Sequence, residues 1–310
     1  MTAVNAQPSP LPNSPDPCAS ADCVTAEALL AWRRSLLQQH PGGSAAELDW
    51  LLDLGGGLGW QALQQLHLHP QRPVVLQRSL VALAGLWQRH LQEQIPLQYL
   101  LGVCPWRDLS LQVAPGVLIP RAETELLVEL ALQLPEAPPG LWADLGSGSG
   151  VLAVALARAW PHSQGLAVEL SDVARQQAAV NLQAAELAAR VQLLAGSWWQ
   201  PLAPWWGQLQ LVVANPPYIP TAVWARLEPG VREHEPRLAL DGGADGLDAL
   251  RVIAAGARAA LAPGGGLLLE HHCDQADAVA ALLAAAGLQQ LGRHHDLEGH
   301  WRFASARAPL

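Results

Sequence analysis

Between Leu141 and Ala306, strand-like and helix-like segments alternate along the chain, and this order restricts the fold more than any other feature. Short apolar runs indicate buried strands, amphipathic segments between most of them indicate helices, and the alternation predicts a doubly wound α/β sheet. The expected strands are Leu141–Leu145, Gly165–Leu170, Val191–Leu194, Leu209–Ala214, Gly266–Glu270, Leu288–Arg293 and His300–Ala306. The expected helices are Val151–Trp160, Asp172–Leu187, Leu247–Leu261 and Gln275–Ala286. Only a short connection separates the last two strands, so we expect a hairpin there and an antiparallel final strand.

Three segments precede this α/β domain, which we place at residues 129–310. Residues 1–22 are rich in Pro, Ser, Asn and Ala and predict a disordered tail. Residues 23–103 carry apolar side chains at helical spacing, with a capping box at Ser44 and Glu47, and predict a small all-α domain. Residues 104–128 are expected to link the two domains through a β-hairpin, because Trp106–Pro120 alternates apolar and polar residues around a Pro-Gly turn.

The amino-acid composition restricts the kinds of partner and the cellular compartment that we expect for this protein. The net charge is −9 and all 18 basic residues are scattered Arg, whereas sequence-independent nucleic-acid binding favours a basic stripe. No signal peptide is evident, and no apolar run approaches the roughly 18 residues of a membrane span. No disulfide framework is expected from the cysteines, which are Cys18, Cys23, Cys104 and Cys273. We therefore expect a cytoplasmic protein that binds neither membranes nor nucleic acid directly.

A glycine-rich segment, "DLGSGSG", joins the first expected strand to a helix. Ligands of such sheets bind outside the carboxyl ends of the strands, and Gly146, Gly148 and Gly150 allow the backbone to approach a ligand closely. A dinucleotide fingerprint would place its third glycine at position 151, which is Val151. The spacing therefore favours a nucleoside without pyrophosphate, such as S-adenosylmethionine, with a dinucleotide as the alternative.

Glu169 ends the second expected strand, about 25 residues after Asp144. A carboxylate at this position can accept hydrogen bonds from both ribose hydroxyls of such a ligand, although it could also be an exposed strand-end residue. A second glycine-rich segment, Asp53–Trp60, follows a helical pattern and lacks a surrounding βαβ unit. We interpret its glycines as a helix end and loop.

The fourth expected strand ends in an unusual corner of Asn215, Pro216, Pro217 and Tyr218. The prolines are rigid and lack N–H groups, and an Asn side chain supplies one acceptor oxygen. Such an acceptor-rich corner suits a planar NH₂ group, against which the Tyr218 ring could also pack. The alternative is a rigid turn capped by Asn.

The corner also suggests a reaction. An amide or aniline-like nitrogen is a poor nucleophile because its lone pair is delocalised. Acceptance of its hydrogens by Asn215 Oδ1 and the Pro216 carbonyl favours a pyramidal nitrogen facing a sulfonium methyl group. This would be catalysis by positioning and electrostatics without a dedicated general base.

Motifs along the chain resemble a known family. "NPPY" downstream of "DLGSGSG" resembles the class I amino-methyltransferases, which modify adenine, cytosine or glutamine nitrogens. From about residue 25 to the C-terminus the chain resembles the HemK-type peptide chain release factor glutamine methyltransferases. The motifs that carry this resemblance are "IPLQYLLG" at 95–102, "VLIPRAETELLVE" at 117–129, "EPRLALDGGADGLDALR" at 235–251 and "GGGLLLEH" at 264–271.

The resemblance implies a Rossmann-like S-adenosylmethionine-dependent enzyme that methylates the glutamine of the Gly-Gly-Gln loop of release factors and leaves S-adenosyl-L-homocysteine. It also implies roles for particular residues. The methionine part of the cofactor would lie on Gly146, Ser147, Gly148, Ser149 and Gly150, the ribose on Glu169, and the adenine by Trp198. The glutamine would be held by Asn215, Pro216, Pro217 and Tyr218, with Asn215 also near the cofactor. Ala122 and Ser197 depart from the usual Pro and acidic residue at their positions.

Two other functions remain open from the residues. A DNA or RNA adenine amino-methyltransferase could use the same corner, but it would need a basic recognition domain. A non-catalytic S-adenosylmethionine-binding adaptor could dock on release factors. The His-, Cys- and acid-rich segments Glu270–Asp274 and Gly292–His300 are expected to flank loops and to bind no metal.

Overall fold

A computed structural model describes residues 23–39 and 42–310 and divides the chain into two compact units, Met1–Leu101 and Gly102–Leu310. The tail predicted at residues 1–22 lies outside the described residues. No helix within the described ranges is long and apolar enough to cross a membrane. Among the described cysteines, Cys104 and Cys273 are free thiols, but Cys23 is disulfide-bonded, contrary to the expectation from the sequence.

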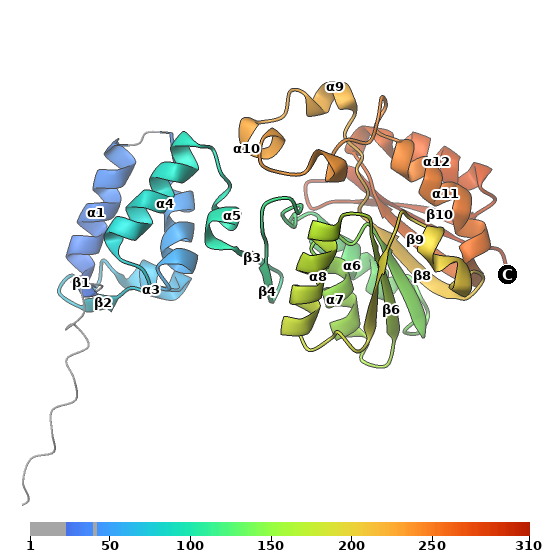
Figure 1. Cartoon of the computed structure of the whole chain (residues 1–310), viewed down its shortest axis with the longest axis horizontal. Helices are drawn as coiled ribbons and strands as arrows, with labels where there is room; N and C mark the ends of the chain where they lie inside the picture. The colour runs from blue at the N-terminus through green and yellow to red at the C-terminus, as the bar shows by residue number, and fades with distance from the viewer. Residues whose placement is uncertain (1–22, 40–41) are drawn as a thin grey trace, which may run out of the picture. The chain divides into compact units, whose positions relative to one another are not determined.

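The first unit is a helical bundle with a small two-stranded sheet that the sequence did not predict (Figure 1). Its leucine-rich core includes Trp87, which is fully buried. The predicted capping box is confirmed, because Ser44 Oγ accepts from Glu47 N at 3.1 Å and Ser44 N donates to Glu47 Oε2 at 2.9 Å. The elements are β1 (Cys23–Thr25), α1 (Ala26–Gln39), α2 (Ala45–Trp50), the π-helix η1 (Leu51–Gly55), α3 (Trp60–Gln65), β2 (Pro73–Val75), α4 (Leu80–Gln92) and α5 (Leu97–Leu101).

The glycines of Asp53–Trp60 form a helix end and loop, as predicted. Helix η1 ends at Gly55, and Gly59 directly precedes α3. The second unit opens with the expected hairpin, β3 (Val103–Trp106) and β4 (Leu109–Gln112). Its turn, however, is at Arg107–Asp108 and not at the Pro-Gly pair, because the buried side chains of Trp106 and Leu111 fix the pairing.

The main sheet has seven strands in the order β10-β11-β9-β8-β5-β6-β7. The α/β class and the antiparallel last strand are confirmed: β11 is antiparallel to both of its neighbours, whereas β9, β8, β5, β6 and β7 are mutually parallel. The strands are β5 (Leu141–Leu145), β6 (Gln164–Glu169), β7 (Val191–Ala195), β8 (Leu209–Ala214), β9 (Leu261–Glu270), β10 (Gln289–His295) and β11 (Trp301–Arg307).

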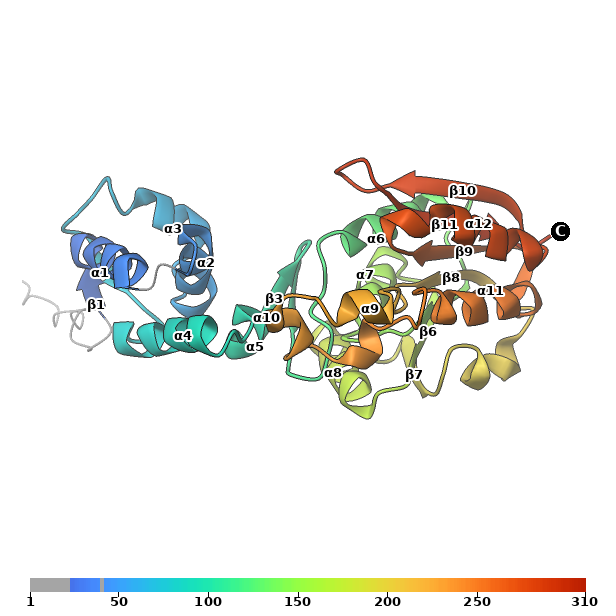
Figure 2. The ribbon, with the colours of Figure 1, turned by 90° about the horizontal axis from the view of Figure 1, so that it is seen from above.

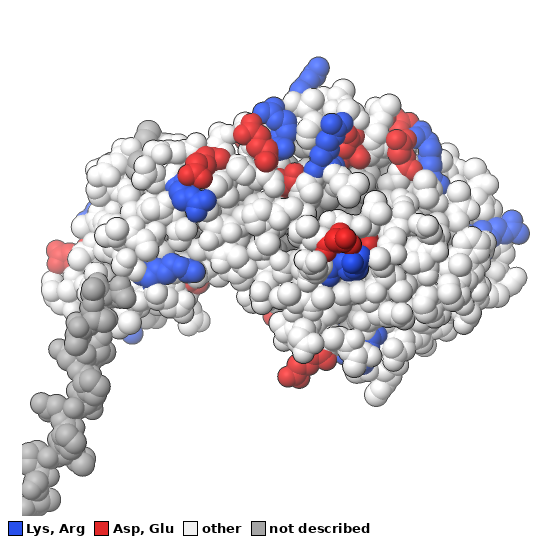
Figure 3. Space-filling model, viewed as in Figure 1, with Lys and Arg blue, Asp and Glu red and all other residues white. Residues whose placement is uncertain are grey.

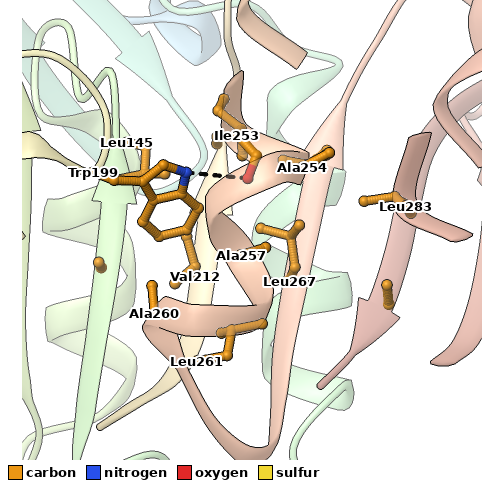
Figure 4. Packing of buried hydrophobic residues seen from close by; sticks show 14 of the residues in the cluster. Leu145, Trp199, Val212, Ile253, Ala254, Ala257, Ala260, Leu261, Leu267 and Leu283 are labelled. Carbon is orange, nitrogen blue, oxygen red and sulfur yellow. Dashed lines mark hydrogen bonds between the residues drawn. The ribbon is translucent and has the colours of Figure 1, made fainter. Parts of the chain in front are cut away.

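Helices cover both faces of this sheet (Figures 1 and 2). One face packs against α6 (Thr124–Gln133), α7 (Val151–Ala159) and α8 (Asp172–Ala184), together with the hairpin. The other packs against α11 (Asp248–Ala260), α12 (Ala276–Ala285) and the 3₁₀-helix η2 (Gln200–Trp205). Figure 4 shows the second layer, in which Trp199 is buried and its indole N–H donates to the Ile253 carbonyl at 3.1 Å.

Several elements of the second unit were not expected. Helix α6 precedes the first strand of the main sheet, and three short helices follow β8. These are α9 (Thr221–Trp224), α10 (Pro229–Arg232) and the 3₁₀-helix η3 (Arg237–Ala239), while a further 3₁₀-helix, η4 (Cys273–Gln275), precedes α12. The three helices after β8 belong to a segment that returns along the carboxyl edge of the sheet, as the parallel bridge of Ile219 with Asp241 indicates.

Candidate active site

The glycine-rich loop is fixed to the neighbouring strand at the carboxyl edge of the sheet. Gly146 N and Ser147 N both donate to the Val168 carbonyl, at 2.9 and 3.0 Å. The next residue, Glu169, is 8% exposed and accepts from Gly148 N and Ser171 N, each at 2.8 Å. Glu169 therefore holds the loop against β6, and each of its oxygens uses one of two lone pairs in doing so.

The three glycines of the loop all have positive φ, which L-residues adopt at a cost, but they serve different contacts. A Cβ on Gly148 would meet nothing within 4 Å, so its backbone faces open space. A Cβ on Gly146 would lie 3.2 Å from the Trp198 ring. A Cβ on Gly150, the residue before α7, would lie 3.0 Å from Ala178 Cβ on α8.

A cavity of about 690 Å³ lies at this edge and joins both halves of the predicted site. Its walls include the predicted residues Gly146, Gly148, Glu169, Trp198, Asn215 and Pro217. Ser147, Ser149, Gly150, Pro216 and Tyr218 do not line it, although they adjoin residues that do. The remaining walls come chiefly from residues 116–118, 236–243 and the start of α11.

Two adjacent tryptophans face opposite environments. Trp198 has φ +47°, a left-handed conformation, and its ring lies over Gly146 in the cavity wall. Trp199 is 6% exposed and packs in the core below α11. Strain at a cavity-lining residue is typical of functional sites.

The Asn215 corner is anchored by a buried hydrogen-bond chain. Asn215 Nδ2 donates to Thr124 Oγ1 at 2.9 Å, and the Thr124 hydroxyl donates to Glu270 Oε2 at 2.8 Å. The Tyr218 hydroxyl donates to Glu270 Oε1 at 3.1 Å. Asn215 Oδ1 accepts no hydrogen bond from the described residues, so it is available at the cavity.

Glu270 is 1% exposed, and its burial raises the pKa of its carboxyl group to about 7, against the lowering effect of the hydrogen bonds from Thr124 and Tyr218. Burial also raises the pKa of Tyr218, and the Glu270 charge adds to this. Thr124 and Glu270 were not among the site residues expected from the sequence. An acidic residue ending a strand beside Asn215 was the available signal.

The rest of the corner is supported from behind. Ile219 N donates to the Leu240 carbonyl at 3.0 Å, and Gly242 N donates to the Ile219 carbonyl at 2.8 Å. The Tyr218 carbonyl accepts from Gln275 Nε2 at 2.9 Å. The carbonyls of Tyr218 and Ile219 are thus engaged within the protein, and the corner is held on both sides.

A second buried carboxylate joins two walls of the cavity. Glu235 accepts from Ile119 N at 3.1 Å and from the Arg121 guanidinium at 2.6 Å, and its side chain is 1% exposed. The wall at 116–118 and the wall at 236–243 are therefore fixed to each other directly beside the cavity.

Comparison with known proteins identifies the family. The model of the Methyltransferase small domain family matches residues 122–224. A release factor glutamine methyltransferase of Prochlorococcus marinus is 49% identical over 92% of this chain and 98% of its own length. The chain belongs to the release factor glutamine methyltransferase family. Relatives of the same description in Thermosynechococcus vestitus and Synechocystis sp. are 48% and 40% identical, over 76% and 92% of this chain and 81% and 97% of their own lengths.

In this member of the release factor glutamine methyltransferase family, the matched residues 122–224 run from just before α6 to the end of α9. They include the glycine-rich loop, Glu169, Trp198 and the Asn215 corner. Glu270 lies outside that range, although it completes the hydrogen-bond chain. The described residues hold no group of three or more His, Cys, Asp or Glu side chains arranged for a metal ion.

Proposed function

We propose that this protein transfers a methyl group from S-adenosylmethionine to the side-chain amide nitrogen of the glutamine in the Gly-Gly-Gln loop of peptide chain release factors. The observation that carries the proposal is the state of Asn215. Its amide nitrogen is engaged by Thr124, so its carbonyl oxygen is left as an acceptor at a cavity that also contains Glu169 and Gly148. The reaction class follows from family membership, and the sequence relatives are described as acting on release factor glutamine.

S-adenosylmethionine fits the residues on one side of the cavity. The backbone at Gly148 faces open space, as close approach of a ligand requires, and Glu169 retains one lone pair on each oxygen for the ribose hydroxyls. The Trp198 ring offers an apolar wall to the adenine. In this proposal residues 146–150 cradle the methionine part, with Ser147 and Ser149 shaping the loop from below.

The other side of the cavity holds the acceptor amide. Asn215 Oδ1 would accept one of its hydrogens at the cavity wall. The second acceptor expected from the sequence is the carbonyl of Pro216, a buried residue that adjoins the wall but does not line the cavity. Two such acceptors would favour a pyramidal nitrogen with an available lone pair. The sulfonium methyl group would come from bound S-adenosylmethionine. The acceptor nitrogen would take it and lose one proton to water, and the electron pair of the broken C–S bond would stay on sulfur. Pro217 lines the cavity beside this point, and Tyr218 steadies the corner through Glu270.

The proposal includes the remaining expectations from the sequence. These are a cytoplasmic location, no direct nucleic-acid or membrane partner, and a helical domain and hairpin linker at 23–103 and 104–128 before a methyltransferase domain at 129–310. The charge pattern supports the expectation of no direct nucleic-acid or membrane partner. On the face in Figure 3 several basic side chains lie beside acidic ones. The ion pairs of the described residues include Arg232–Glu233, Arg237–Asp241 and Arg251–Asp245.

A transfer assay tests the proposal against its alternatives. The protein is incubated with methyl-labelled S-adenosylmethionine and, separately, a release factor, the same factor with its loop glutamine replaced, and DNA. We expect label in the unmodified factor alone. Label in DNA but not in the factor would favour an adenine amino-methyltransferase. Bound cofactor with no label anywhere would favour a non-catalytic adaptor.

A further inference from the structure

The carboxamide group of Asn215 can be oriented in two ways, with either its oxygen or its nitrogen toward the cavity. The two ends of a carboxamide are nearly identical in size, but one accepts hydrogen bonds and the other donates them. With Oδ1 toward the cavity, Asn215 can accept a hydrogen from an acceptor NH₂ group. With Nδ2 toward the cavity, it would present hydrogens to hydrogens and repel the same group. Only one of the two orientations supports transfer to an amide.

The hydrogen bonds from Asn215 through Thr124 to Glu270 select one of these two orientations. A charged Glu270 is an acceptor only, so the single hydroxyl hydrogen of Thr124 must point at Glu270 Oε2. Thr124 Oγ1 can then only accept from Asn215, and this requires Nδ2 on the Thr124 side. The other oxygen of Glu270 is occupied by the Tyr218 hydroxyl, so the carboxylate is held from two directions.

The fold brings these groups together from distant parts of the chain. Ala214 on β8 is paired with Leu269 on β9, so Asn215 and Glu270 are the next residues at the ends of neighbouring parallel strands. Thr124 is the first residue of α6, which packs against both strands, and it is 2% exposed. The hydrogen-bonded series of Asn215, Thr124 and Glu270 therefore lies at the sheet edge, and its last two members lie outside the cavity wall.

We infer that Thr124 and Glu270 are positioning residues for methyl transfer, which hold the Asn215 amide with its oxygen toward the acceptor nitrogen. The inference rests on the proposed function and adds to it the groups that give Asn215 its polarity. Neither residue lines the cavity. Both therefore act through Asn215, and Glu270 also acts through Tyr218.

The arrangement depends on the charge of Glu270. When this carboxyl binds a proton it can donate to Thr124 Oγ1, whose own hydrogen is then free to turn toward Asn215 and favour the reversed amide. The charged and titratable groups facing Glu270 are Tyr218 from the corner, Arg302 on β11 and Glu123 before α6. Because the Glu270 pKa is about 7, the correct orientation is favoured as pH rises through neutrality.

The test compares Thr124→Val, which keeps the side-chain shape and removes the hydroxyl, with Thr124→Ser, which keeps the hydroxyl. Val128→Ala, a buried truncation one turn later on α6, is the matched control for lost packing. With labelled S-adenosylmethionine and a release factor, we expect kcat to fall about 10- to 100-fold in Thr124→Val, since small misplacements in a reacting pair can cost roughly 100-fold. Thr124→Ser should restore most of the activity, and Val128→Ala should lower the unfolding temperature while changing kcat little.

Two further readouts separate positioning from a purely structural role. S-adenosylmethionine affinity, measured by calorimetry, should be the same in Thr124→Val and wild type. The kcat of wild type should rise with pH through an apparent pKa near that of Glu270, about 7, and this rise should disappear in Glu270→Gln. An unchanged kcat in Thr124→Val, or an unchanged pH profile in Glu270→Gln, would overturn the inference. A wild type that labels no release factor would instead overturn the proposed function.

Discussion

At the scale of single residues, Asn215 and Glu169 line the same cavity, and the proposed function gives Asn215 to the acceptor amide and Glu169 to the cofactor. Asn215 contributes one free carbonyl oxygen, whereas Glu169 contributes a carboxylate whose two oxygens already hold Gly148 and Ser171. Loss of Asn215 should therefore affect transfer, and loss of Glu169 should also disturb the loop. This difference makes Asn215 the better residue for separating chemistry from cofactor binding.

Substitution of Asn215 by Ala should abolish turnover while S-adenosylmethionine binding largely survives. Removal of one preorganised hydrogen-bonding group in an active site typically costs about 100- to 1,000-fold in kcat. The measurements are initial rates of label transfer to a release factor and cofactor titration by calorimetry on the same preparation. If affinity and rate fall together, the corner serves the cofactor more than the acceptor amide.

At the scale of elements, the loop between β5 and α7 lines the cavity at one glycine and packs against a neighbouring helix at another. Gly148 and Gly150 have φ values of +55° and +81°, so alanine at either position adopts a left-handed backbone at a cost of roughly 1–2 kcal/mol. The two glycines differ in what their missing side chains face. Gly148 faces open space, and Gly150 faces Ala178 of α8.

Gly150→Ala should therefore destabilise the second unit more than Gly148→Ala. The added methyl would lie 3.0 Å from Ala178 Cβ, so α8 must shift slightly, and overpacking of this kind costs about 1–3 kcal/mol. Gly148→Ala should instead weaken S-adenosylmethionine binding, because its methyl group enters the cavity. Thermal unfolding and cofactor calorimetry of both variants provide the comparison. The reverse order of stabilities would show that α8 yields readily at Ala178.

Some helices, strands and turns could be predicted from the sequence and others could not. The seven strands of the main sheet and the helices α7, α8, α11 and α12 were predictable because apolar runs of two different periods alternate. Helix α6 was missed because seven of the eleven residues of "TELLVELALQL" are apolar, so the helical spacing of its buried face is hidden among other apolar residues. The hairpin turn was misplaced because Arg107 adopts φ +54° without a glycine, while the nearby Pro-Gly pair gave a stronger turn signal.

The candidate site divides in the same way. The glycine-rich loop, Glu169 and Asn215 could be predicted, because each ends or follows a strand and carries its own chemistry. Glu270 gave one signal, as an acidic residue at the end of a strand, but the role of Thr124 and Glu270 comes from a contact between residues 146 positions apart in the chain. Trp198 and Trp199 are chemically identical, and only the backbone conformation decides which one faces the cavity.

At the scale of the whole molecule, the sheet edge gathers two buried carboxyl groups whose ionisation opposes folding. Asp144 is 1% exposed, and burial followed by the charge of Glu169 raises its pKa to about 8, against the lowering effect of the Ala153 backbone N–H. The pKa of Glu270 is raised to about 7. A group with a raised pKa binds its proton more tightly in the folded state. Its stabilising contribution is therefore complete below the unfolded pKa and is lost as pH rises through the folded pKa.

Substitution of Asp144 by Asn should remove part of this pH dependence. The model value for an unfolded Asp is 3.8, so wild type should lose stability relative to Asp144→Asn between pH 4 and pH 8, with little further change above pH 8. Each pH unit in that window is worth about 1.4 kcal/mol per proton. A domain of this size shifts its unfolding midpoint by roughly 2–4 °C per kcal/mol, so the gap between the two proteins should widen by several degrees from pH 5 to pH 8.

The measurement is thermal unfolding of the full chain at pH 5, 7, 8 and 9, with Asp277→Asn as the matched control. The Asp277 side chain is 90% exposed, so this substitution should give a difference from wild type that is independent of pH. Acid-induced unfolding by other groups affects all three proteins equally and cancels in the comparison. A gap between Asp144→Asn and wild type that stays constant with pH would mean that Asp144 is charged and solvated in the folded protein. In that case the sheet edge beneath the glycine-rich loop would have to admit water, and the loop would be less tightly seated on β6 than its hydrogen bonds to Val168 and Glu169 indicate.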